Sequence, residues 1–160
     1  SDGNYHWLYF RTFISVKMKI LILQGPNMNL LGLKSSQAGN RLTLDKLNKD
    51  LRVHAHSIGA ELKFLQTHKQ FQAINFIQRN RNNADGILII PTSWARNDWT
   101  LSETLRLIDL PISVIYFDEP FSFGTPKTDS ILNGDHFHSI TGHPIQACKK
   151  GIDFLMTHHK

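Results

Sequence analysis

Cysteine is nearly absent from this chain of 160 residues, in which Cys148 is the only one. One cysteine cannot form an internal disulfide, and such low usage is typical of a reducing compartment. No apolar run approaches the length of a membrane span, and the start lacks the basic and then apolar order of a signal peptide. We therefore expect a cytoplasmic protein that does not contact a membrane.

Clusters of basic residues are lacking as well. The formal net charge is +5, but the lysines and arginines are scattered along the sequence. Proteins that bind nucleic acids usually show a basic stripe or a recognisable module. The charge therefore predicts no nucleic-acid partner and mildly favours a small anionic ligand. The glycine-rich phosphate-binding motifs are missing after the first apolar segment, which disfavours nucleotide binding.

The sequence does contain short apolar segments that alternate with amphipathic ones. Residues 19–23 form an apolar run that Gln24, Gly25, Pro26 and Asn27 end abruptly. Continuous apolar runs are typical of strands buried on both faces, as in parallel sheets. Further strands are predicted near residues 62–65, 85–90, 112–117 and 138–141, and helices near residues 44–58, 69–80, 99–108 and 144–157. This alternation predicts a three-layer α/β fold with a parallel sheet.

Local signals set the ends of these segments. Thr43 is expected to cap the first long helix and Gly59 to end it. In the second helix, Phe71, Ile74 and Ile77 are expected to face inward. The polar residues 33–41 predict a mobile loop, and the long irregular stretch 118–135 is typical of a lid or cover.

The first 17 residues differ from the rest in being rich in aromatic side chains. We interpret them as upstream or vector-derived sequence, or as an added edge strand. Residues 18–160 are predicted to form one domain, a length that suffices to bury a core.

A motif at the first turn carries a resemblance to a known family. Gly-Pro-Asn-x-Asn-Leu-Leu-Gly spans residues 25–32, and Leu-Thr-Leu at 42–44 and Ala-Asp-Gly-Ile at 84–87 follow it. From Met18 to about Met156 the chain resembles type II 3-dehydroquinate dehydratases. The resemblance implies a flavodoxin-like sheet of five strands in the order 2-1-3-4-5, a homo-oligomer (trimer or dodecamer) and no cofactor.

The family's reaction converts 3-dehydroquinate to 3-dehydroshikimate and water through an enolate. It needs a tyrosine base whose pKa a neighbouring arginine lowers, and a histidine acid. The resemblance places Gly39 at the tyrosine and Arg96 at the histidine. Glycine has no side chain, and arginine cannot donate and regain a proton near neutral pH. Because each group commonly contributes roughly a hundred- to ten-thousand-fold, the family mechanism is expected to be lost.

The positions that hold the substrate are altered in part. Asn27 matches the family's asparagine near the enolate, and Lys34 stands where the family has arginine. Ile90 replaces a second asparagine. On the fourth strand, Val114 and Tyr116 replace a glutamate and a histidine, and the lid arginines fall near Phe123 and Lys127.

Two alternatives stay open for these residues. Tyr116 could act as a new base with its pKa depressed by Lys34 or Arg96, which would make the protein an active lyase on 3-dehydroquinate or a related hydroxy acid. Otherwise it is packed at the strand end with its hydroxyl in water. Lys34, Arg96 and Lys127 either form an anion site around Asn27 or are three solvated cations.

The histidines suggest a metal only superficially. His136 and His138 would share a face of a strand, but a third ligand of known position is missing, so we predict no metal site. His54 and His56 cannot share a helix face and are expected at the surface.

Overall fold

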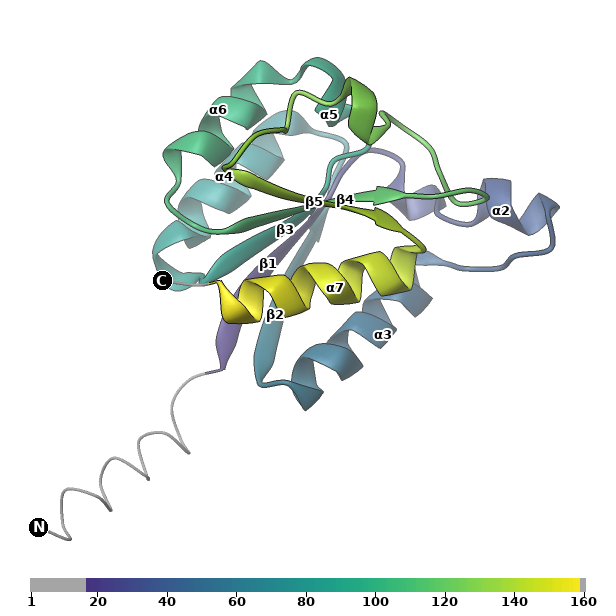
Figure 1. The fold of residues 1–160 in the computed structure, drawn as a ribbon, viewed down its shortest axis with the longest axis horizontal. Helices are drawn as coiled ribbons and strands as arrows, with labels where there is room; N and C mark the ends of the chain where they lie inside the picture. The colour runs from purple at the N-terminus through teal and green to yellow at the C-terminus, as the bar shows by residue number, and fades with distance from the viewer. Residues whose placement is uncertain (1–16, 159–160) are drawn as a thin grey trace, which may run out of the picture.

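The computed structural model describes residues 17–158, and the predicted edge strand in the first 17 residues lies almost entirely outside them. Figure 1 shows a central sheet with helices packed above and below it. None of the described helices is long and apolar enough to cross a membrane.

The sheet has five parallel strands in the order β2-β1-β3-β4-β5, as the resemblance implied. The strands are β1 (Met18–Gln24), β2 (Ala60–Gln66), β3 (Gly86–Ile90), β4 (Ile112–Phe117) and β5 (Phe137–Gly142). Every residue of β3 is buried, as are most of those in β1 and β4. The continuous apolar runs therefore occupy the centre of the sheet, because strands covered on both faces have no polar side.

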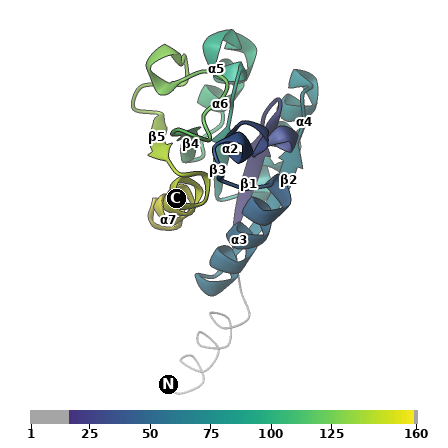
Figure 2. The ribbon, with the colours of Figure 1, turned by 90° about the vertical axis from the view of Figure 1, so that its right-hand side faces the viewer.

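Two pairs of helices cover the two faces of the sheet. Helices α3 (Leu44–Ser57) and α7 (Pro144–Thr157) pack on one face, and α4 (Gln70–Asn80) and α6 (Trp99–Leu107) on the other (Figures 1 and 2). Each pair encloses its own apolar cluster. Leu47, Leu51 and Ile152 belong to the first cluster, and Ile77, Leu101 and Leu105 to the second. The three-layer prediction is confirmed.

The predicted helix ends agree with the structure for the first long helix. The Thr43 hydroxyl accepts a hydrogen bond of 3.2 Å from the backbone N–H of Lys46, so Thr43 is the N-cap. Gly59 follows the helix with φ +81°, a conformation that glycine adopts at little cost.

The prediction that Phe71 faces inward is wrong. Its side chain is 59% exposed, whereas Ala73 and Ile77 are buried. Phe71 lies in the first turn of α4, and the Lys69 ammonium lies 5.9 Å from the centre of its ring.

Short helices lie in the segment predicted as a loop and in the connection after β3. Residues 33–41 begin with α2 (Leu33–Gln37), and the loop after β3 contains α5 (Trp94–Asn97). Three single turns of 3-10 helix complete the fold: η1 (Met28–Leu30), η2 (Arg81–Asn83) and η3 (Lys127–Asp129). The stretch after β4 is otherwise irregular, as predicted.

The connections that follow β1, β3 and β4 meet at one edge of the sheet. Gly25 N–H donates to the Ile90 carbonyl at 2.9 Å, which ties the turn after β1 to the end of β3. The stretch after β4 extends toward α2 at the same edge (Figure 1). Ligands of open α/β sheets bind at the carboxyl ends of strands, so this edge is the place to search for a site.

Candidate functional site

A cavity of about 360 Å³ lies at the carboxyl ends of β3 and β4, and we call it the β3–β4 cavity. Ile90 and Thr92 form its wall at β3, and residues 115–117 form its wall at β4. Residues 122–126 of the connection after β4 and Lys34 of α2 complete it. This volume lies within the range of small-molecule sites.

The wall at β3 contains an unusual backbone conformation. Thr92 has φ +50°, although it is β-branched and residues of this kind rarely adopt positive φ. Its hydroxyl donates to the Pro26 carbonyl at 2.8 Å, and its carbonyl accepts from Thr125 N–H at 3.2 Å. These bonds hold the turn after β1 and the connection after β4 over the end of β3. Strained residues of this kind concentrate at functional sites.

A second cavity, of about 260 Å³, lies beside the turn after β1, and we call it the β1 cavity. Most of its lining is apolar. It is formed by Asn27, Leu30, Gly32, Leu33, Lys34, Ser35, Phe121 and Phe123. Since Lys34 and Phe123 line both cavities, the two cavities adjoin at these side chains.

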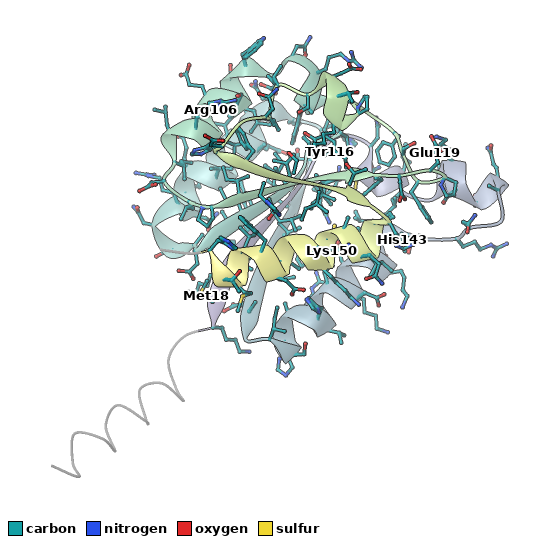
Figure 3. All side chains as sticks on the ribbon, in the orientation of Figure 1. Met18, Arg106, Tyr116, Glu119, His143 and Lys150 are labelled. Carbon is teal, nitrogen blue, oxygen red and sulfur yellow. The ribbon has the colours of Figure 1, made fainter. Side chains whose placement is uncertain are left out.

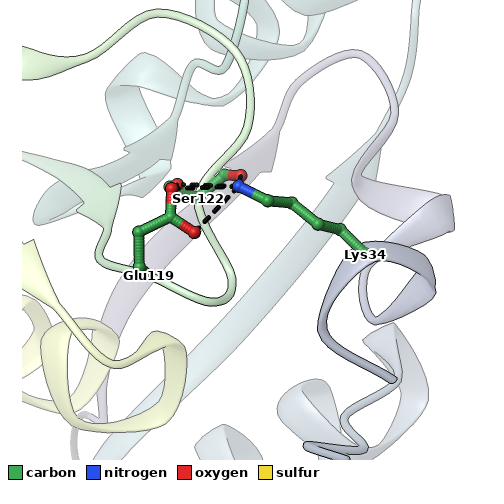
Figure 4. Close-up of polar contacts among 3 residues, drawn as sticks. All are labelled: Lys34, Glu119 and Ser122. Atoms are coloured by element: carbon green, nitrogen blue, oxygen red, sulfur yellow. Dashed lines mark hydrogen bonds and ion pairs between the residues drawn. The ribbon is translucent and has the colours of Figure 1, made fainter. Parts of the chain in front are cut away.

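An ion pair stands at this boundary. The Lys34 ammonium lies 3.0 and 2.8 Å from the two carboxylate oxygens of Glu119 and donates to the Ser122 carbonyl at 3.0 Å (Figure 4). The Ser122 hydroxyl donates a short hydrogen bond to Glu119 Oε1. The hydrogen bond from Lys34 is the main cause that holds the pKa of the Glu119 carboxyl below its usual value. Lys34 was predicted from the sequence, whereas its partners Glu119 and Ser122 were not.

Asn27 lies at the turn after β1 with φ +68°. Its backbone N–H donates to His68 Nδ1 at 3.2 Å, so the imidazole accepts at Nδ1. Asparagine tolerates this left-handed conformation better than most residues. Asn27 lines the β1 cavity with Lys34, and the structure therefore brings these two predicted residues together.

Tyr116 is packed near the end of β4, as one of the two interpretations has it, but the rest of both interpretations is wrong. It is 6% exposed, and its hydroxyl donates to the Ser130 hydroxyl at 2.7 Å, so the expectation of a hydroxyl in water is wrong. Burial raises the pKa of the Tyr116 phenol, so the prediction of a depressed pKa is wrong too. Tyr116 lies inside the fold on β4, whereas Glu119 lies on the projecting stretch near α2 (Figure 3).

Arg96 and Lys127 line neither of the two cavities, although Lys127 directly follows Pro126 in the lining of the β3–β4 cavity. One terminal nitrogen of Arg96, on α5, is 3.7 Å from Asp129 Oδ2, and Lys127 belongs to the same turn, η3, as Asp129. The structure thus places Lys34 beside Asn27 but does not gather the three cations around it.

Gly39 is exposed just beyond α2, with φ +83°. A Cβ atom added there would meet no other atom within 4 Å. The place that the resemblance assigns to the base is therefore open space.

The histidine pair does not share a face. The His136 Nε2 atom lies 2.7 Å from the Leu105 carbonyl of α6, whereas His138 stacks on Phe154 of α7, with ring centres 3.8 Å apart. The prediction was wrong because His136 precedes β5 and does not follow the alternation of the strand. Among residues 17–158 no three His, Cys, Asp or Glu side chains gather as metal ligands.

His54 does more than lie at the surface. It is partly buried between α3 and α7, and its Nε2 lies 2.7 Å from Asp153 Oδ1.

Comparison with known proteins identifies the family. The model of the family described as dehydroquinase class II matches residues 18–156. The chain belongs to this family. The match covers the sheet, all of its connections and both cavities.

Curated relatives share this assignment. The 3-dehydroquinate dehydratase of Carboxydothermus hydrogenoformans is 28% identical over 143 residues, which cover 89% of this chain and 93% of that protein. The 3-dehydroquinate dehydratase of Photorhabdus laumondii is 36% identical over 110 residues, which cover 66% of this chain and 73% of that protein.

A solved structure supports the fold. The type II dehydroquinase of Propionibacterium acnes superposes with a TM-score of 0.74 at 20% identity and covers 89% of this chain and 99% of that one. At this identity, the similarity bears on the fold alone.

Proposed function

We propose that this chain is a class II dehydroquinase that has lost dehydration of 3-dehydroquinate and keeps a binding site for a small anion. The observation that carries the proposal is the pair of replacements at the base and acid positions. Gly39 offers no side chain, and Arg96 is directed to Asp129 rather than into a cavity. Proton removal from carbon and proton return to the leaving hydroxyl both require a group at these places.

The cavities supply the part of the site that persists. Lys34 contributes a cation to both, and Asn27 adds an amide to the β1 cavity. Lysine keeps the positive charge of the family's arginine but not its forked geometry. It can therefore attract a carboxylate, but it lacks the planar pair of N–H donors that would fix both carboxylate oxygens. We propose Asn27 and Lys34 as the ligand-binding residues, with Arg96 and Lys127 outside the site.

The alternative of a rebuilt lyase site receives less support. A phenol whose pKa is raised is a poorer base near neutral pH than a free tyrosine, and the Tyr116 hydroxyl already donates to Ser130. Hydrogen bonds with the side chains of Ser130 and Ser139 lower this pKa by less than burial raises it.

Enone formation from 3-dehydroquinate tests the loss of activity. The 3-dehydroquinate dehydratase of Photorhabdus laumondii, assayed under the same conditions, serves as the positive control. We expect at least a ten-thousand-fold lower kcat/KM for this chain, the lower end of what losing both a base and an acid costs. Turnover within a hundredfold of the control would overturn the proposal.

Ligand-dependent stabilisation tests the binding site. We expect 3-dehydroquinate, quinate or citrate to raise the melting temperature of the wild type and not that of Lys34→Met. Lys49→Met, which removes a cation from an exposed position of α3, is the matched control. A homo-oligomer is part of the proposal, and sedimentation of the same samples measures it.

A further inference from the structure

The β1 cavity has an unusual combination of exposed apolar side chains. Leu30 is 48% exposed and Leu33 is 62% exposed, and both line it from the chain after β1. Phe121 and Phe123 line it from the connection after β4. Large aliphatic side chains facing water beside two aromatic rings are typical of a surface that a partner or ligand covers.

The aromatic wall is held in place before any ligand binds. Phe121 is 7% exposed, and the edge of its ring meets the His143 imidazole with the centres 4.9 Å apart. Phe123 packs edge-to-face on Phe117 of β4, with the centres 6.3 Å apart. Aromatic pairs of this geometry are mutually stabilising, so a ligand would meet a formed wall.

The polar groups of the β1 cavity are few. The Ser35 hydroxyl is already used, since it donates to the Gly32 carbonyl at 3.3 Å. Asn27 and Lys34 are the other polar side chains in the lining. A ligand with many hydroxyl groups would lose hydrogen bonds to water here, because the lining cannot replace them.

The Lys34 ammonium is already paired with a carboxylate of the same chain. Glu119 takes two contacts from the ammonium and one from the Ser122 hydroxyl. The pair is accessible to water, with side-chain exposures of 54% and 71%. Exposed ion pairs of this kind contribute little net free energy, so another carboxylate can replace Glu119 at small cost.

We propose that the β1 cavity binds a small apolar monocarboxylate, with an aromatic or aliphatic ring against Leu33 and Phe123, whose carboxylate displaces Glu119 from Lys34. This inference deepens the proposed function and rests on it. Glu119 then acts as an internal competitor that lowers the affinity of Lys34 for every carboxylate, and a ligand with an apolar body regains affinity from the lining. Charge selects the carboxylate, and the apolar lining selects the ring.

Binding of benzoate by Glu119→Gln tests the competition. The amide keeps the size of the glutamate but loses the charge that holds Lys34. Because an exposed ion pair contributes little net free energy, we expect benzoate to bind Glu119→Gln only about three- to fivefold more tightly than it binds the wild type, as measured by calorimetry. Glu103→Gln, an exposed glutamate of α6, is the matched control and should bind like the wild type.

Two further probes separate charge from shape. Benzamide, which has the shape of benzoate without its charge, should bind the wild type and Glu119→Gln alike. Lys34→Met should lose the preference for benzoate over benzamide. Quinate, a carboxylate whose ring carries hydroxyl groups, should bind Glu119→Gln less tightly than benzoate does.

The proposal fails if Glu119→Gln binds benzoate no better than Glu103→Gln, or if quinate binds as well as benzoate. It also fails if Leu33→Asp changes the oligomeric state and leaves benzoate binding intact, because the apolar residues would then contact a second copy of the chain. None of these results changes the outcome expected in the enone assay. Conversely, turnover of 3-dehydroquinate would overturn the proposed function but would not contradict the competition between Glu119 and a bound carboxylate.

Discussion

The Tyr116 hydroxyl donates a 2.7 Å hydrogen bond to the Ser130 hydroxyl, which ties β4 to the end of the long connection that follows it. Ser130 in turn accepts from Leu132 N–H at 3.0 Å. The hydroxyl considered as an alternative catalytic base is therefore engaged in holding the connection between β4 and β5.

Tyr116→Phe should change how stability depends on alkaline pH. Burial raises the pKa of this phenol in the folded state, so the unfolded chain ionises first as the pH rises above about 10. Tyr116 therefore favours the folded state fully below that pH and loses this effect as the pH rises further. We expect the free energy of unfolding of the variant to be about 1 kcal/mol lower at neutral pH, because the hydrogen bond is lost. We expect it to fall less steeply than that of the wild type as the pH rises above about 10.

Urea unfolding at several pH values measures both effects in one series. Ser130 keeps Leu132 as a partner in the variant, so no new unpaired donor complicates the comparison. Parallel pH curves for the wild type and Tyr116→Phe would contradict the prediction.

Thr43→Ala should destabilise the protein by about 1 kcal/mol, as removal of an N-cap does. The alanine cannot accept from Lys46 N–H, which Thr43 does at 3.2 Å. Thr43→Ser keeps the accepting oxygen and is the control. Thermal unfolding of the wild type and both variants separates the effect of the cap from other effects. If the serine and alanine variants lost the same stability, the role assigned to the Thr43 hydroxyl would be refuted.

The positions of the buried strands and of that cap were accessible from the sequence for physical reasons. Apolar runs without alternation belong to strands covered on both faces, and Thr43 precedes a segment of helical periodicity. The order 2-1-3-4-5 itself came from the family resemblance, since alternation of strands and helices does not fix it.

The errors share a different cause. Strand alternation places Tyr116 and Ile115 on opposite faces but does not say which helices cover each face, so the burial of the phenol could not be predicted. Phe71 fits the helical period and still faces water, because periodicity does not locate the helix relative to the sheet. Glu119 lies 85 residues from Lys34 in a stretch without periodicity, and no local pattern connects them.

Gly124→Ala and Gly39→Ala should lower the free energy of unfolding by different amounts, although the two glycines have similar φ angles. Both glycines have positive φ, +78° and +83°, so each alanine is strained to a similar degree. A Cβ atom at Gly124 would lie 2.8 Å from the backbone of Thr92, whereas one at Gly39 meets nothing. We expect Gly124→Ala to be the less stable variant by about 1–3 kcal/mol, the usual cost of overpacking.

Urea unfolding of both variants gives this difference directly. If the two alanines cost the same, the contact between the connection after β4 and the end of β3 is not tight in solution, and the role of Thr92 in holding it would have to be abandoned.

Gly39→Tyr and Arg96→His test which replacement removed the chemistry. A Cβ atom at position 39 meets no other atom within 4 Å, so a side chain can be introduced there against the strain of a positive φ. We expect neither single variant to form enone from 3-dehydroquinate above the blank, since each still lacks the other group, and each group is worth roughly a hundred- to ten-thousand-fold. The double variant should be the most active of the three. Melting curves verify that each variant is folded. Enone formation by Gly39→Tyr alone would contradict the prediction, because it would show that the leaving hydroxyl can be protonated while Arg96 is present.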